Sequence, residues 1–174
     1  MRRRLLVTAC AALLVTAAGL LAYHQAGAET GSHAGAVTRE QAREVYRGKV
    51  VAMRDTDGID LDLGLLTTQA TRGIDVTPWG QGNHLVTKSG ATMVLLADTG
   101  PESYQRCAAV PAERLVVTVR GLYAIPAPRN MCVWTREGRV AMLTLDETPS
   151  PRSGTLALHY VVWQPPGPTS LVAR

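Results

Sequence analysis

From residue 50 onward, short apolar segments alternate with clusters of turn-forming residues, and this pattern limits what the chain can fold into more than any other feature. Several segments alternate apolar and polar residues, which is the period of a half-buried β-strand. The clusters between them, such as PWGQGN, DTGP and IPAPRN, are rich in residues that favour tight turns. We expect strands at residues 50–54, 59–66, 73–77, 92–97, 114–122, 131–135, 139–145 and 155–163.

About eight short strands with little helix indicate an all-β fold, an antiparallel β-sandwich or barrel. A short N-terminal helix is expected before the first strand, because Thr38 suits an N-cap, Gln41 follows at capping-box spacing, and apolar residues then recur at helical spacing. One further helical turn is expected between residues 98 and 110. A length of 174 residues and an apolar fraction of 46% fit one domain with its own core.

The first 28 residues have the features of a signal peptide. Three arginines at positions 2–4 precede an apolar run at residues 5–22, and the sequence AGA at 26–28 supplies the small residues of a cleavage site. Cleavage there leaves 15 Lys and Arg against 14 Asp and Glu, so the net charge of +4 gives no case for nucleic-acid binding. The expected organisation is a signal peptide at 1–28, a linker at 29–37, a β-sandwich domain at 38–164 and a flexible tail at 165–174.

Two alternatives to secretion keep the chain at a membrane. The run at residues 5–22 could remain as an uncleaved anchor, since about 17 to 25 apolar residues span a bilayer. The sequence LVTAC, ending at Cys10, resembles a lipid-attachment box, although few apolar residues precede it.

Removal of the signal peptide would leave two of the three cysteines, Cys107 and Cys132. In an oxidising compartment such a pair is by default a disulfide, which would stabilise the fold by about 3.5 kcal/mol through loop closure. The alternative is a catalytic thiol, but neither cysteine lies in a nucleophile motif. The segment MCVWTREGRVAMLTL at 131–145 predicts a hairpin turning at Gly138, with Trp134 in the core beside Cys132.

The segment DTDGIDLDLG at 55–64 has two interpretations. As a calcium loop with Gly58 at the sixth position, it lacks the first and twelfth ligands. As a strand, it places four apolar residues from Ile59 to Leu65 on one face and carboxylates on the other. We expect the strand, and we keep Asp57, Asp60 and Asp62 as a candidate cation site of another type.

The segment TPWGQGNH at 77–84 is the best candidate for a binding loop. Trp79 offers an aromatic platform for a sugar or peptide, and Asn83 and His84 can hydrogen-bond to such a ligand. The alternative is that Trp79 folds back over the core, as most tryptophans do.

No catalytic motif is present, and His84 and His159 stand isolated in the sequence. We therefore expect no catalytic residues, no cofactor and a monomeric, exported binding module, with cell-wall carbohydrate, a peptide or an envelope protein as ligand. The alternatives are an envelope hydrolase whose active site is assembled only in the fold, or a structural secreted protein.

Four segments resemble a β-rich extracytoplasmic domain of high-GC Gram-positive bacteria: IDLDLG, DTGPESYQRC, MCVWTREGRVAMLTL and LHYVVW, within residues 55–163. That domain of unknown function occurs in secreted proteins and as the outer portion of some membrane Ser/Thr kinases. The resemblance implies a disulfide and an extracellular location, and no catalytic residues. This chain carries no kinase domain, so a sensory role does not transfer with the resemblance.

Overall fold

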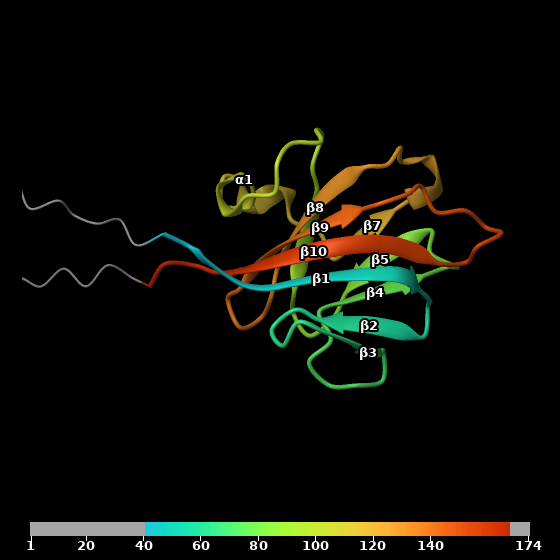
Figure 1. The fold of residues 1–174 in the computed structure, drawn as a ribbon, viewed down its shortest axis with the longest axis horizontal. Coiled ribbons are helices and arrows are strands. Elements are labelled where there is room, and N and C mark those ends of the chain that lie inside the picture. Colours follow the sequence, from blue (N-terminus) through green and yellow to red (C-terminus); the bar gives the residue numbers. More distant parts are fainter. Residues whose placement is uncertain (1–40, 168–174) are drawn as a thin grey trace, which may run out of the picture. The chain divides into compact units, whose positions relative to one another are not determined.

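The computed structural model describes residues 41–167, which form two antiparallel sheets of five strands each (Figure 1). In spatial order, the first sheet contains β1 (Arg43–Met53), β10 (Leu156–Gln164), β9 (Val140–Leu145), β8 (Arg129–Trp134) and β6 (Thr92–Leu95). The second sheet contains β3 (Leu65–Thr68), β2 (Asp57–Asp60), β4 (Val76–Trp79), β5 (His84–Thr87) and β7 (Thr118–Arg120). The helices are α1 (Tyr104–Ala108) and the 3₁₀ turns η1 (Ala112–Arg114) and η2 (Leu122–Ala124). The expected all-β fold is confirmed in this two-sheet arrangement.

The main core lies between the two sheets. Buried apolar side chains from strands of both sheets form one continuous cluster, with Leu143 and Leu158 of the first sheet among those packed with Ile59, Val76 and Leu85 of the second. This burial of facing sheets is the packing of a β-sandwich.

A second apolar cluster covers the outer face of the first sheet. Cys107 of α1 and Cys132 of β8 form a disulfide there, with Cα atoms 5.5 Å apart, and Met142, Val161 and Trp163 pack around it. The segment containing α1 thus forms a third layer, which is why every residue of β9 is buried. The predicted disulfide and the predicted helical turn are both confirmed.

The predicted short N-terminal helix is wrong, because residues 43–53 form strand β1. This strand pairs with β10 from Arg43 opposite Gln164 to Met53 opposite Leu156, and Figure 1 shows the two strands side by side. Helix capping and helical spacing contribute little free energy compared with the pairing of β1 to β10 and its contacts with the core. The tertiary pairing therefore decides the conformation.

The predicted single strand at 59–66 is also wrong, because the segment is a hairpin of β2 and β3 with a turn at residues 61–64. Gly64 adopts φ +67°, which only glycine takes readily. The turn leaves Leu63 and Leu65 more than half exposed, at 57% and 55%, and buries Asp60 and Asp62. The expected division of apolar and acidic residues between two faces is therefore reversed at these four positions.

The other strand predictions agree with the structure to within a few residues at most ends, and β5 was not predicted. The hairpin of β8 and β9 is confirmed, with Gly138 at φ +84° in its turn and Trp134 beside the disulfide. Strand β7 occupies only Thr118–Arg120 of the strand expected at 114–122.

The signal peptide, Cys10, the whole linker at 29–37 and all of the tail beyond residue 167 fall outside the described residues. Among residues 41–167, no helix is long and apolar enough to cross a membrane.

Candidate functional site

The first two carboxylates of the acidic segment hold backbone groups in place. Asp55 accepts hydrogen bonds from the amides of Gln81 and Gly82, at 2.8 and 3.2 Å, and so fixes the loop between β4 and β5. Asp57 accepts one from the amide of Arg54 at 2.8 Å and closes the turn into β2. The Asp57 bond is of the local kind that Asp commonly makes in turns, whereas Asp55 joins two segments that are distant in the sequence.

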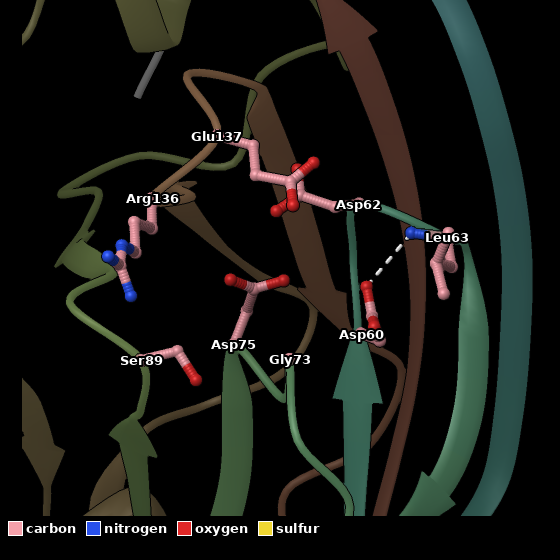
Figure 2. Close-up of a pocket in the computed structure, with 8 residues that line it drawn as sticks. All are labelled: Asp60, Asp62, Leu63, Gly73, Asp75, Ser89, Arg136 and Glu137. Atoms are coloured by element: carbon pink, nitrogen blue, oxygen red, sulfur yellow. Dashed lines mark hydrogen bonds between the residues drawn. The ribbon is translucent and has the colours of Figure 1, made fainter.

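The next two carboxylates lie at the tip of the β2–β3 hairpin. Asp60 accepts a hydrogen bond from the amide of Leu63 at 2.9 Å, which shapes the turn (Figure 2). Asp62 accepts one from the hydroxyl of Thr135 at 2.7 Å, and Arg139 donates to its backbone carbonyl. Asp62 thus anchors this hairpin to the β8–β9 hairpin of the other sheet.

A further carboxylate, that of Asp75, lies beside Asp60 and Asp62 in the fold, and Asp75 is only 1% exposed. It accepts a hydrogen bond from the amide of Leu61 at 2.8 Å. Burial, with a smaller contribution from the charges of Asp62 and Asp60, raises the pKa of Asp75 to about 7, and the hydrogen bond from the Leu61 amide opposes this rise. Figure 2 shows the Asp75 carboxylate in the middle of a pocket of about 480 Å³, which we call the acidic pocket. Its lining is Asp60, Asp62, Leu63, Gly73, Asp75, Ser89, Arg136 and Glu137.

The candidate cation site at Asp57, Asp60 and Asp62 is not assembled as expected. Asp60 and Asp62 line the acidic pocket, whereas Asp57 does not and is bonded to the amide of Arg54. In the part of the chain that the structure describes, no three His, Cys, Asp or Glu side chains are grouped so as to hold a metal ion.

A second concave surface lies on the outer face of β4, β5 and β7. Trp79 pairs with His84 across β4 and β5, and His84 pairs with Arg120 across β5 and β7. In the neighbouring cross-strand row, Thr77 lies opposite Val86, and Val86 lies opposite Thr118. Together with Lys88, these residues line a hollow of about 390 Å³, which we call the Trp79 face; its lining is Thr77, Trp79, His84, Val86, Lys88, Thr118 and Arg120.

Trp79 is 57% exposed, so it does not fold back over the core. The other two tryptophans, Trp134 and Trp163, pack in the apolar cluster around the disulfide. A large aromatic side chain that stays in water on a regular strand contributes little to folding, which makes it a candidate contact for a ligand.

The loop of residues 80–83, which follows Trp79, is held in place by hydrogen bonds with Asp55 and Tyr123. Tyr123 donates from its hydroxyl to the carbonyl of Gln81 at 2.8 Å, and Asp55 holds the amides of the same loop. The Asn83 side-chain oxygen accepts a hydrogen bond from the amide of Tyr123 at 3.2 Å, and Asn83 does not line the hollow. Of the three residues expected in the binding loop, the structure brings Trp79 and His84 together and uses Asn83 as a support.

His84 lines the hollow, and one of its ring nitrogens is hydrogen-bonded to the backbone. Its Nδ1 accepts a hydrogen bond from the amide of Gly121 at 3.4 Å, which places the proton of the neutral ring on Nε2. A bound hydroxyl, carboxylate or phosphate oxygen can accept that proton in a hydrogen bond.

His159 lies on β10, in the other sheet from His84, as the sequence suggested for a strand residue. It contacts Asp146 and Glu102, and Lys49 and Arg47 complete the group by ion pairs to those two carboxylates. Burial alone would raise the pKa of Asp146, but hydrogen bonds from His159 and Lys49 outweigh it and hold this pKa below its usual range. The group is a network of opposite charges at the surface and does not involve the Trp79 face.

Comparison with protein-family models, with curated proteins and with solved structures finds no match for this chain.

Several charged residues of these sites were not predicted from the sequence: Asp75, Arg136 and Glu137 of the acidic pocket, and Lys88 and Arg120 of the Trp79 face. The alternation of Thr118 and Arg120 beside buried Val119 gave a signal for an outward-facing arginine. Nothing in the sequence indicates that Asp75 contacts a turn 14 residues earlier in the chain.

Proposed function

We propose that this chain is a non-enzymatic binding module and that its ligand lies on the Trp79 face. The observation that carries the proposal is the exposure of Trp79, which is 57% exposed beside the hollow. Hydrogen bonds with Asp55 and Tyr123 hold the loop next to it in place. Aromatic side chains presented in this way stack on sugar rings or on flat side chains of peptides. Among the ligand classes considered, cell-wall carbohydrate, peptide and envelope protein, carbohydrate fits the hollow best, because polar donors flank the aromatic surface.

The test is a titration of the purified protein with oligosaccharides and wall polymers, followed by tryptophan fluorescence. Trp134 and Trp163 are packed around the disulfide, so a change in emission on binding reports chiefly on Trp79. Trp79→Ala should weaken binding by about tenfold or more, because it removes the stacking surface. Val51→Ala is a control, since Val51 is also exposed, at 73%, but lies on β1 and lines neither the Trp79 face nor the acidic pocket. A polymer that binds both variants as tightly as the unaltered protein would show that the Trp79 face is not its site.

We further propose that the protein is exported and acts as a monomer outside the cytoplasm. The signal-peptide pattern at residues 1–28 and the disulfide both support this location. Mass spectrometry of the protein recovered from culture medium should find a chain that starts at Glu29. A chain found only in membranes, with its first residues intact, would support an anchor instead. The resemblance to the extracytoplasmic domain of high-GC Gram-positive bacteria agrees with this proposal.

A second candidate function, an envelope hydrolase, is favoured by one observation in the acidic pocket. Asp75, with its pKa raised to about 7, lies beside Asp60 and Asp62, and hydrolases use a protonated and an ionised carboxyl group together. The hydrogen bond from Leu61 to Asp75 already gives the carboxylate a structural role, so the binding proposal stands first. A screen on peptidoglycan and ester substrates separates the two: turnover abolished by Asp75→Asn but retained by His84→Ala would establish the hydrolase. A purely structural protein would show neither turnover nor binding.

A further inference from the structure

We propose that the Trp79 face selects acidic oligosaccharides, whose rings carry a carboxylate or phosphate group, over neutral ones. This inference rests on the proposed binding function and adds the charge of the ligand to it.

The first argument is the charge of the surface. Lys88 and Arg120 are exposed at the hollow, His84 adds a ring N–H donor, and no carboxylate is among the described residues that line it. Asp55, which supports the loop beside Trp79, is bonded to the amides of Gln81 and Gly82. The chain as a whole is nearly balanced outside its first 28 residues, so two cations in one hollow without a carboxylate are a local feature of this surface.

The second argument is the order of the side chains across the strands. Trp79, His84 and Arg120 form one cross-strand row, so the aromatic surface and the guanidinium stand at opposite ends with a donor between them. Adjacent strands are about 4.8 Å apart, so a row over three strands extends for roughly 10 Å. One sugar ring stacked on Trp79 would therefore place a neighbouring unit near His84 and Arg120.

The third argument is the chemistry of the cation. A guanidinium binds a carboxylate or phosphate with two parallel hydrogen bonds, whereas a neutral hydroxyl offers no matching charge. Lys88 at the same hollow adds a second positive charge that does not depend on fixed geometry. Stacking would supply affinity for a sugar in general, and the two cations would supply the preference for an acidic one.

The experiment compares trigalacturonate with its fully methyl-esterified form, which has the same rings and no charge. Inorganic polyphosphate serves as an anion without rings. Affinities are measured by isothermal titration at low salt and again at about 0.5 M salt, where charge interactions beyond a few ångströms are screened. The variants are Trp79→Ala, Arg120→Gln and, as a matched control, Arg152→Gln in the exposed turn before β10.

We expect the acid to bind at least tenfold more tightly than the ester at low salt, and this ratio to shrink at high salt. Arg120→Gln should remove most of the ratio while leaving binding of the ester intact, Trp79→Ala should weaken both, and Arg152→Gln should change neither. Equal affinity for acid and ester, lost in Trp79→Ala, would overturn the inference and leave the binding proposal in place. Binding of polyphosphate as tight as that of the acid and insensitive to Trp79→Ala would also overturn it. Absence of binding to all the oligosaccharides would contradict carbohydrate binding itself.

Discussion

At the scale of single residues, four aspartates of this protein hold its own backbone in place. Asp55, Asp57, Asp60 and Asp75 each accept a hydrogen bond from a backbone amide in a turn or loop. A buried carboxylate gains from such bonds but loses its hydration, and the two effects oppose each other. Asp75 is the residue in which the loss of hydration dominates.

Asp75 should make stability depend on pH in a direction opposite to that of most acidic residues. Its pKa rises from the ordinary value of 3.8 to about 7 on folding, so between these values the folded protein binds more protons than the unfolded chain. The free energy of unfolding therefore falls as pH rises from about 4 to about 7. Asp75→Asn keeps an oxygen for the amide of Leu61 and carries no charge, so it should be more stable than the unaltered protein at pH 8 and close to it at pH 4.

Urea unfolding of both proteins at several pH values measures this difference, and the titration of groups that do not interact with Asp75 cancels in the comparison. A difference that stays constant from pH 4 to pH 8 would mean that Asp75 titrates normally in the folded protein.

The residues that the sequence identified correctly are those whose role depends on local chemistry. Gly138 lies in a hairpin turn because of its neighbours, and Cys107 and Cys132 pair because they are the two cysteines of the domain. Trp79 was identified as a loop aromatic with two possible positions, and only the pairing of β4 with β5 decides between them. Asp75 could not be identified, since its environment is made by segments that are distant in the sequence.

At the scale of elements, β1 shows how long-range packing decides a local conformation. Gly48 lies opposite Tyr160 of β10, and a Cβ atom at this glycine would overlap the phenol ring. The hydroxyl of Tyr160 donates to the carbonyl of Gly64 at 2.9 Å, which joins the first sheet to the β2–β3 turn of the second. A helix at residues 43–53 would lose the pairing with β10 and the close contact of Gly48 with Tyr160. Helical spacing and capping residues are local features, so they do not report these long-range contacts.

Gly48→Ala should therefore destabilise the protein by about 1–3 kcal/mol, the usual cost of overpacking. A glycine inside an ordinary strand would give the opposite result, because alanine restricts the unfolded chain. In a Tyr160→Ala background the clash is absent, so Gly48→Ala should cost close to nothing there. A double-mutant cycle measured by chemical unfolding provides the test, and an equal cost in both backgrounds would remove Tyr160 as the cause.

At the scale of the whole molecule, the sequence predicted an all-β sandwich or barrel, and the structure has two antiparallel sheets with a further layer over the first. Strand periodicity and turn residues were sufficient to predict an all-β protein because they act within a few residues. The third layer over the first sheet was predicted only in part: its helical turn and its disulfide were expected, whereas its apolar contacts with Met142 and Trp163 join residues that are distant in the sequence. The same layering separates the disulfide from the Trp79 face, because the two lie on different sheets.

Stability and ligand binding should therefore be separable in this protein. Replacement of both cysteines, Cys107→Ala with Cys132→Ala, should lower the free energy of unfolding by about 3.5 kcal/mol, the value expected for a loop of this length. The affinity for a ligand of the Trp79 face should stay within about twofold, since β4, β5 and β7 keep their own pairing and their contact with the main core. Urea unfolding and titration of the same preparation measure both quantities, at a temperature where the variant is folded. A loss of affinity in parallel with stability would mean that the layer held by the disulfide also positions the second sheet, and that the two faces of the molecule are coupled through the core.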